Sequence, residues 1–411
     1  MDFLKIMFRG DRIIWFIFIS LCALSLVEVY SATSTLAYKE PNYWLPILRH
    51  SKHLLLGLLA IIFVHHLHYR WLGGLVFLFF IAAIVLALTP YIGTSINNEL
   101  RWVSFFGILF QPSELAKLGS IGFIAFLMSR IGQTFTEKHV YWIIVICMTP
   151  VLFLILIYNA STALILAAVV FSMMMMGQIP WSRLLKTGAC ALAIVGLYGT
   201  FLCLAPIDLL EKVPPSRDLT WRSRILSFGS DTEKSEEEKK EGIVLTDKNY
   251  QKIHAKIAIA KGGMTPRMPG HGTQRDFLPQ AYSDFIYAII IEELGLFAGI
   301  ITIFAYVAIL IRVRKIAQGC KNRLFPKYLV LGCGLLLVLQ AFINMAVATD
   351  FFPVTGQPLP LVSTGGTSTI LSCTYIGIIL CISRITEDEK KADETQVETL
   401  DPSVINIEEE A

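Results

Sequence analysis

The chain has 411 residues, of which 55% are hydrophobic and 16% are charged. Ordinary soluble domains are about a quarter charged, so this composition excludes a typical water-soluble protein. The formal net charge of +3 is nearly neutral and indicates no nucleic-acid partner, and the positions of the charges are more informative than their sum.

Apolar runs of roughly twenty residues recur from the N-terminus to about residue 384. That length matches a hydrocarbon core about 30 Å thick. We therefore predict an all-α polytopic membrane protein, one domain over residues 1–384, with about ten transmembrane helices. The predicted spans are residues 13–33, 47–66, 71–90, 112–129, 139–157, 161–178, 185–206, 284–311, 328–350 and 359–383. The second is the least secure, because Arg49, His50, Lys52 and His53 lie near one end of it.

The first predicted span follows Lys5, Arg9 and Arg12 and is too long for the apolar region of a signal peptide. We interpret it as an uncleaved anchor. Connectors on the side of the N-terminus hold 17 Lys and Arg residues, whereas the short connectors on the other side hold 4. Because cytoplasmic connectors carry the excess of Lys and Arg, both termini are predicted to be cytoplasmic.

Charged side chains cluster around the start of the fourth predicted span. Pro112 marks the first helical turn on the outer side, and Arg101 precedes it beside Trp102. An arginine near a helix N-terminus suits an anion such as phosphate, although an interfacial arginine beside a tryptophan anchor is the alternative. Glu114 and Lys117 are three residues apart and close enough to pair. A structural pair and a substrate site explain them equally well.

A segment of 77 residues, 207–283, separates the seventh and eighth predicted spans and is predicted to lie outside the cell. Its charge run, residues 231–241, is typical of a solvated stretch. Trp221 and Arg222 precede this run, and an aromatic and acidic patch at 275–288 follows it. A loop of this length is uncommon unless it is disordered or functional.

Asp284 lies where the long outer loop enters the membrane, a border of low dielectric at which a carboxylate can be tuned as a general base. Aspartate is also a favoured helix N-cap, and its position alone does not separate the two roles. Glu292 and Glu293 follow, and at least one is predicted to be a buried partner of a cation or backbone group. Glu28 in the first span has no evident partner, so its role stays open.

The last predicted span is preceded by an irregular segment. Pro358 and Pro360 exclude a regular helix, while Gly365 and Gly366 allow close approach of the backbone. Irregular backbone at membrane depth must be buried in protein or line a cavity. The small residues 363–368 could pack helices together, form a pocket wall, or do both.

The remaining features indicate neither a metal site nor a disulfide framework. Residues 385–411 are acidic without apolar periodicity, so we predict a disordered cytoplasmic tail. The eight cysteines lie in or beside apolar segments or in a basic connector, and the long outer loop has none. His65, His66 and His68 fit a span end better than a metal site, and there is no P-loop or Rossmann motif.

Four segments, in this order and spacing, resemble the SEDS family (shape, elongation, division and sporulation). They are RWVSFFGILFQPSELAKL at 101–118, TWRSRI at 220–225, LPQAYSDFIYAIIIEELG at 278–295 and PLPLVSTGGTS at 358–368. The resemblance implies the SEDS fold, with a large extracytoplasmic loop between helices 7 and 8. It also implies a peptidoglycan glycosyltransferase of the cytoplasmic (inner) membrane. Such an enzyme polymerises lipid II, an undecaprenyl-pyrophosphate disaccharide-pentapeptide, at the outer membrane face.

The resemblance also implies roles for single residues. The essential aspartate of the family's SDF or TDF motif falls on Asp284, expected to be the general base, and a second acidic position falls on Asp276. Arg101, Lys117 and Arg222 are expected to stabilise the departing diphosphate. A divalent cation (Mg or Mn) could share that task, although no dedicated ligand set is visible. Further matched positions expected to bind substrate are Glu114, Trp221, Pro279, Ser363, Gly365 and Gly366.

The chain departs from the family pattern in two places. Residues 262–272 read GGMTPRMPGHG, in which two prolines and an arginine interrupt a usually glycine-rich stretch, so a different loop shape is expected. Residues 158–163 read YNASTA where many members have a Pro-Asp pair. Either Asn159 replaces an acid or that acid is dispensable.

The forms of PLPLVS and QPSELAKL favour the division branch of the family over the elongation branch. Either branch implies a class B penicillin-binding protein, an FtsI-like transpeptidase, as partner, together with other division proteins and membrane lipid. A lipid II flippase is the main alternative, but transporters place binding groups near the midplane, often within inverted repeats. Here these groups gather at the outer border. A scaffold of the division complex is the third interpretation.

Overall fold

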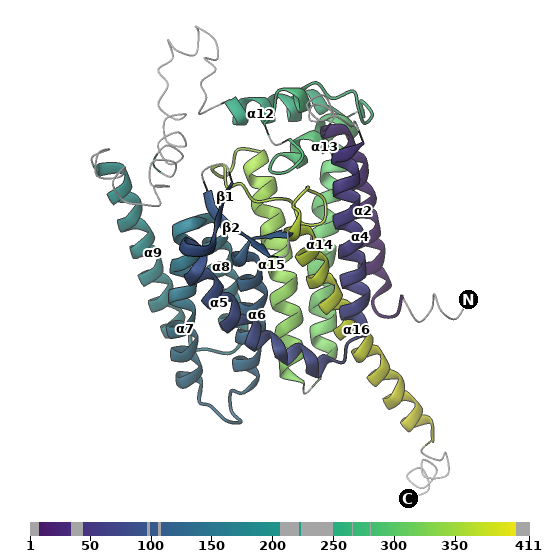
Figure 1. Cartoon of the computed structure of the whole chain (residues 1–411). Helices are drawn as coiled ribbons and strands as arrows, with labels where there is room; N and C mark the ends of the chain where they lie inside the picture. The colour runs from purple at the N-terminus through teal and green to yellow at the C-terminus, as the bar shows by residue number, and fades with distance from the viewer. Residues whose placement is uncertain are drawn as a thin grey trace, which may run out of the picture.

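A computed structural model gives the fold as a bundle of long helices that run nearly side by side (Figure 1). It describes residues 8–33, 44–96, 99–105, 108–205, 222, 250–264, 266–279, 281–321 and 323–399, but not the side chains of 94–101, 105, 108 and 393–399. Trp221 and the charge run 231–241 therefore lie outside the described residues. We call the end of the bundle beneath α12 (Tyr250–Gly262) the loop end, and the opposite end, where the C-terminal helix leaves, the tail end.

Eight helices of the described chain are long and apolar enough to cross a membrane. They are α2 (Arg12–Ala32), α4 (Leu45–His66), α5 (Leu75–Ile92) with the preceding 3-10 helix η1 (Tyr69–Gly74), α7 (Glu137–Tyr158), α9 (Trp181–Leu204), α14 (Leu296–Gly319), α15 (Leu324–Ala348) and α16 (Thr367–Thr399). Helices α6 (Pro112–Ser129) and α8 (Ala160–Met176) occupy the other two predicted spans. The predicted all-α polytopic membrane fold is confirmed, including its least secure second span.

The eighth predicted span, residues 284–311, has the wrong boundaries. A short helix, α13 (Ile286–Leu294), ends at Gly295, and α14 begins at the next residue. Gly295 has a φ of 84°, in the left-handed region that glycine adopts readily. Glu292 and Glu293 therefore lie at the end of a short helix at the loop end rather than inside a long span.

A small antiparallel sheet, absent from the sequence prediction, joins α5 to α6. Its strands are β1 (Thr94–Ile96), β2 (Glu99–Phe105) and β3 (Ile108–Phe110), in the order β1-β2-β3. Val103 pairs with Phe110, and the hairpin closes where Phe105 pairs with Ile108. The hairpin delivers the chain to Gln111, which precedes the first turn of α6.

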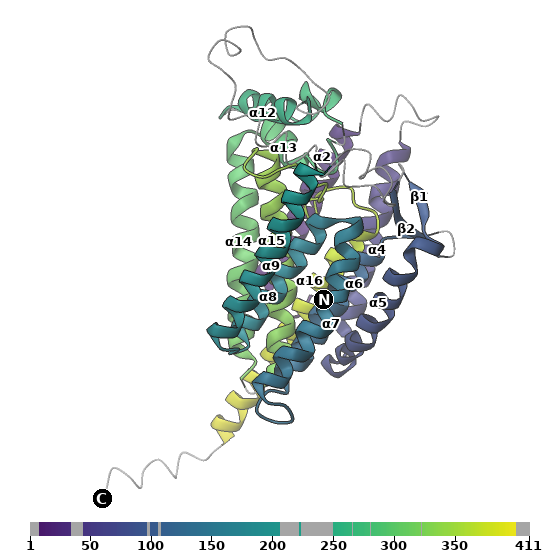
Figure 2. The same ribbon diagram turned by 90° about the vertical axis from the view of Figure 1, so that its left-hand side faces the viewer.

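Helices α15 and α16 form the centre of the bundle. Within their apolar windows, 67% of α15 and 72% of α16 is buried, against 6% of α9. Helix α15 packs on α6, α8, α14 and α16, whereas α9 lies beside α8 at the edge of the bundle (Figures 1 and 2). Polar side chains of α15 can therefore reach buried groups from both halves of the molecule.

Helix α16 continues to Thr399, so the helix extends well past residue 385, where the disordered tail was predicted to begin. Residues 400–411 lie outside the described chain. Two arginines hold the extension: Arg9 pairs with Asp388, and Arg323 Nη1 lies 2.6 Å from Glu389 Oε1. These two ion pairs neutralise part of the negative charge of the C-terminal segment at the tail end.

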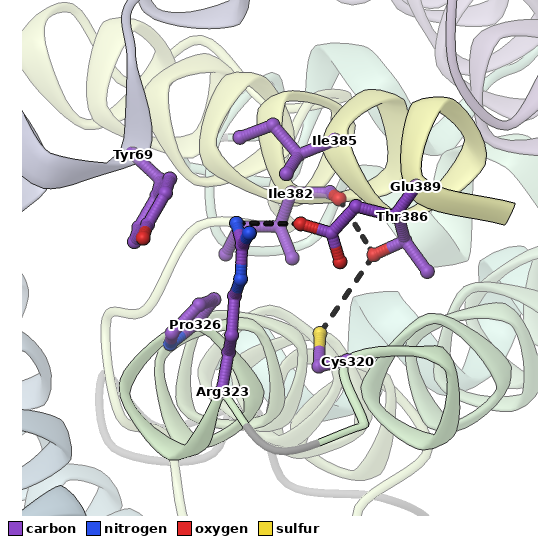
Figure 3. Close-up of a pocket in the computed structure, with 8 residues that line it drawn as sticks. All are labelled: Tyr69, Cys320, Arg323, Pro326, Ile382, Ile385, Thr386 and Glu389. Atoms are coloured by element: carbon purple, nitrogen blue, oxygen red, sulfur yellow. Dashed lines mark hydrogen bonds and ion pairs between the residues drawn. The ribbon is translucent and has the colours of Figure 1, made fainter. Parts of the chain in front are cut away.

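A small pocket sits beside the second of these ion pairs (Figure 3). The guanidinium of Arg323 stacks over the ring of Tyr69, 5.0 Å from its centroid, and thereby links η1 to the start of α15. The pocket is lined by Tyr69, Cys320, Arg323, Pro326, Ile382, Ile385, Thr386 and Glu389. The pocket lies between η1, the connection from α14 to α15, and helix α16, at the tail end of the bundle.

Close packing of α4 on α16 depends on a glycine in α4. A Cβ added at Gly57 would lie 2.5 Å from Cys373 Sγ and 3.1 Å from Cys373 Cβ. We expect Gly57→Val to lower the free energy of unfolding by about 1–3 kcal/mol, because overpacking displaces one helix from the other. The measurement is the midpoint of thermal aggregation of the purified protein in detergent.

Gly73 supplies the matched control, since a Cβ there would meet nothing within 4 Å. Gly73→Val should shift the stability by less than about 0.5 kcal/mol. Equal midpoints for the Gly57 and Gly73 variants would contradict this packing arrangement.

Candidate functional site

Asp284 lies at the loop end, in the turn that leads into α13, with a partly buried side chain. The hydroxyl of Ser283 donates to its Oδ1 at 3.0 Å. The N-cap position of α13 is Phe285, and no side chain caps the helix. The structure therefore does not support the N-cap interpretation of Asp284.

The backbone around Asp284 is fixed by side chains from elsewhere in the fold. The carbonyl groups of residues 282–284 each accept a hydrogen bond. Thr364 donates to the first from its N and its Oγ1, both at 3.0 Å, and Ser363 Oγ donates to the second at 2.6 Å. Asn344 Nδ2 donates to the third at 2.9 Å. Three consecutive carbonyls that no helix or strand satisfies are thus paired inside the protein.

The segment before α16 is irregular, as predicted. Gly356, Leu361 and Gly366 have positive φ values of 67°, 68° and 55°. Ser363 Oγ also accepts a hydrogen bond from Leu359 N at 2.8 Å, so this residue holds two segments together rather than packing helices. A Cβ at Gly356 would lie 3.6 Å from Asp284 Oδ2, so the segment runs directly past the carboxylate.

The predicted contact between Glu114 and Lys117 is confirmed. Lys117 Nζ lies 2.6 Å from Glu114 Oε1 and donates to Gln340 Oε1 at 3.3 Å, and the two charged side chains are only 1% and 8% exposed. The ammonium group is therefore occupied by protein partners. This geometry favours the structural interpretation of the pair over direct contact with a ligand.

Other candidate residues are dispersed. Arg222 Nη1 donates to the carbonyl of Ala205 at 2.6 Å, and the half-exposed Asp276 lies 3.6 Å from Arg275 Nε. Pro279 is exposed. Arg101 belongs to β2, but its side chain lies outside the described part of the structure, as does Trp221.

Glu292 and Glu293 are both fully buried and serve the structural role predicted for at least one of them. Glu293 accepts from Ser31 Oγ at 2.6 Å and from the backbone N of residues 270 and 272 at 3.1 and 3.3 Å. Glu292 accepts from Thr273 N at 2.9 Å and from Gln274 N at 3.1 Å. The two carboxylates thus hold the unusual loop 270–274 against α13 and α2.

A cavity of about 200 Å³ opens beside the carbonyl-bound turn. It is lined by Thr33, Pro46, Arg49, His50, His53, Tyr282, Thr364 and Gly366. We call it the α4 pocket, because four of these residues come from the first turns of α4. Gly366 is the only one of them that the sequence had suggested as a site residue. In the sequence, the basic residues at the start of α4 only weakened the prediction of the second span. That they line one cavity with Tyr282 and Thr364 cannot be predicted from the sequence, because these residues are far apart along the chain.

The α4 pocket presents hydrogen-bond donors. Ser25 Oγ donates to Val362 O at 2.6 Å, so the bond of 2.7 Å between Ser25 Oγ and His50 Nε2 requires the proton on His50. Burial, with a further effect of the Asp284 carboxylate, raises the pKa of Tyr282, which keeps its phenol protonated. Because the Nε2 proton of His50 is donated to Ser25, the groups of this pocket that suit an anion are the guanidinium of Arg49 and the phenol of Tyr282.

The described residues contain no group of three or more His, Cys, Asp or Glu side chains that could hold a metal ion. The donor set around Asp284 consists instead of hydroxyl, amide and carbonyl groups with one carboxylate. The described residues thus offer no dedicated protein ligand set for a divalent cation, and we derive no step through a metal.

Comparison with known proteins gives a consistent result. A family model described as cell cycle protein, covering FtsW, RodA and SpoVE, matches residues 11–388. A Haemophilus influenzae protein named as a probable peptidoglycan glycosyltransferase FtsW is 31% identical over 382 residues, 90% of each chain. A Nitrosococcus halophilus protein of the same name is 29% identical over 387 residues, 91% of this chain and 92% of the relative.

Solved structures share the architecture. A chain of a peptidoglycan synthase complex, studied for the coordination of polymerization and crosslinking, has a TM-score of 0.69 and 25% identity, covering 92% of this chain and 98% of that one. The crystal structure of Thermus thermophilus rod shape determining protein RodA has a TM-score of 0.61 and 23% identity, covering 91% and 97% of the two chains.

The buried ion pair in α6 leads to a prediction about stability. We expect Lys117→Met to lower the free energy of unfolding by about 3–5 kcal/mol, because Glu114 would keep a buried charge without its partner. Removing both charges in the double variant Glu114→Gln, Lys117→Met should restore most of that loss. Thermal aggregation midpoints in detergent measure both effects.

Lys315→Met is the control, since Lys315 is exposed at the end of α14. Its effect should stay below about 0.5 kcal/mol. A single Lys117 variant as stable as the wild type would show that the pair does not support the fold.

Proposed function

The chain belongs to the FtsW, RodA and SpoVE family, and on that premise we propose that it is a peptidoglycan glycosyltransferase that polymerises lipid II into glycan strands. The observation that carries the proposal is the placement of Asp284. Its partly buried carboxylate lies on a turn with fixed carbonyls, next to a pocket of hydrogen-bond donors. A base beside an anion site is what transfer of a sugar from a diphosphate requires.

In the proposed reaction Asp284 acts as general base. Its carboxylate takes the proton of the acceptor sugar 4-hydroxyl as that oxygen attacks the anomeric carbon of the donor. The bond from the anomeric carbon to the diphosphate oxygen breaks, and the diphosphate leaves with the electron pair. Ser283 holds Oδ1, while Oδ2 faces the backbone at Gly356, where a Cβ would lie 3.6 Å away.

The α4 pocket is the proposed site of the diphosphate. Lys117, one of the cations expected for this task, is bound to Glu114 and Gln340. Arg49 and the phenol of Tyr282 take its place in the proposal, because they line an open cavity and Tyr282 belongs to the same turn as Asp284. In a site of low dielectric such donors stabilise the charge that develops on the leaving group.

We infer the orientation from the distribution of Lys and Arg, which places the tail end in the cytoplasm and the loop end at the outer face. A lipid-linked substrate would then present its diphosphate and sugars at the depth of Asp284. The relatives named FtsW support a role in division, and the synthase complex supports a transpeptidase of the class B penicillin-binding type as partner.

The first test addresses the base. Asp284→Asn should reduce glycan polymerisation by about 10²- to 10⁴-fold, because the amide cannot accept the proton. The assay supplies labelled lipid II to the purified protein with its cognate transpeptidase and resolves the products on gels. Asp388→Asn, an acid variant at the tail end, should retain the wild-type rate.

Equal polymerisation by the wild type and Asp284→Asn would refute the enzyme proposal. That result would instead favour the scaffold or the lipid II flippase. Lipid II translocation in proteoliposomes would then separate those two interpretations.

The second test addresses the diphosphate site. Arg49→Gln should lower kcat/KM for lipid II by about 10- to 100-fold, since one hydrogen bond to a charged group contributes about 1.5–3 kcal/mol. Lys52→Gln is the matched control, because Lys52 lies on the same helix end but does not line the pocket. Equal effects of the two substitutions would point to a general surface charge effect and against the α4 pocket.

A further inference from the structure

The amide of Asn344 bridges the base-bearing turn and the irregular segment. Asn344 lies near the loop end of α15 and is 1% exposed. Its Nδ2 donates to the carbonyl of Asp284 at 2.9 Å and to the carbonyl of Gln357 at 2.7 Å. One NH₂ group thus joins the turn that carries the base to the segment that passes over its carboxylate.

The orientation of this amide follows from its surroundings. The Oδ1 atom of Asn344 is buried and has no hydrogen-bond partner among the described residues. Turning the amide over would place that oxygen against two carbonyl oxygens and remove both hydrogen bonds. Both donors are therefore needed where they are, and a residue that can only accept cannot replace asparagine.

Gln340, one helical turn earlier on α15, also donates a hydrogen bond to the irregular segment. It accepts from Lys117 and donates to the carbonyl of Pro358 at 3.4 Å. Two neighbouring carbonyls of the irregular segment are consequently bound from one face of α15. Gln357 also extends the network to α8, because its Nε2 donates to Thr162 Oγ1 at 2.9 Å.

We propose that Asn344 is a positioning residue that sets the depth and direction of Asp284 for proton transfer. Ser363 and Thr364, which bind the two preceding carbonyls, belong to the irregular segment itself. Asn344 is the contact from a rigid, largely buried helix, so it fixes the turn relative to the bundle. It does not contact substrate in this proposal, which rests on the assignment of Asp284 as general base.

The test separates positioning from binding. Asn344→Leu has a similar size and lacks both donors, and Asn344→Ser keeps one donor. With labelled lipid II and the cognate transpeptidase, kcat per monodisperse molecule should fall about 10- to 100-fold in Asn344→Leu, because a displacement of about 1 Å can reduce a rate about 100-fold. KM should stay within about twofold. Asn344→Ser should give an intermediate kcat.

Thr302→Val is the control for removing a buried polar group, since Thr302 is 2% exposed and its hydroxyl donates within its own helix to the carbonyl of Ala298. Its kcat should equal that of the wild type. A wild-type kcat for Asn344→Leu, or a raised KM at unchanged kcat, would overturn the positioning role. If the Leu variant gives no monodisperse protein, a wild-type kcat for Asn344→Ser overturns it.

Asp284→Asn, measured in parallel, keeps the two proposals apart. If Asp284→Asn is inactive while Asn344→Leu has the wild-type kcat, only the positioning role fails. If Asp284→Asn is fully active, the proposed function fails, and the role of Asn344 fails with it.

Discussion

Every backbone N–H and C=O group at membrane depth must find a partner inside the protein, because hydrocarbon offers none. Helices meet this requirement internally, but the turn at residues 282–284 and the segment before α16 cannot. Side-chain donors from Ser363, Thr364 and Asn344 bind the carbonyls of the turn. The position of Asp284 is a consequence of this requirement, because these three side chains fix the backbone of the turn that carries it.

The same constraint governs the buried charges. Glu114 and Lys117 pair within α6, and Glu292 and Glu293 accept hydrogen bonds from the backbone N–H groups of residues 270, 272, 273 and 274. An unpaired charge at these depths would destabilise the fold by several kcal/mol, so each acid is tied to a structural partner. Glu28 differs, because both of its carboxylate oxygens are buried without a hydrogen-bond partner in the described chain. Most of the buried ionisable residues described in this bundle therefore support the fold.

The sequence predicted the features that depend on local composition. Long apolar runs located the spans, and the prolines at 358 and 360 located the irregular segment. The break at Gly295 was missed, because a glycine inside an apolar run does not reveal its φ value. Asn344 has no charge that distinguishes it within its apolar span, although a neutral amide buried in an apolar helix also requires partners, so the sequence did not predict its role. The α4 pocket was missed because it forms between segments hundreds of residues apart, which charge placement alone cannot bring together.

The location of the α4 pocket at the loop end is consistent with the lipid-linked diphosphate that we propose as substrate. Such a substrate keeps its chain in hydrocarbon and its charged groups at the interface, so a site that acts on it must lie at that border. Deep in the bundle the donors would be stronger, but the sugars could not reach them, and in open water Arg49 would be screened. The turn at 282–284 is held at this border from two sides, by α15 below and by the segment before α16 beside it. A fold that must satisfy its own carbonyls at the edge of the membrane therefore provides, at the same depth, a fixed carboxylate with donors close by.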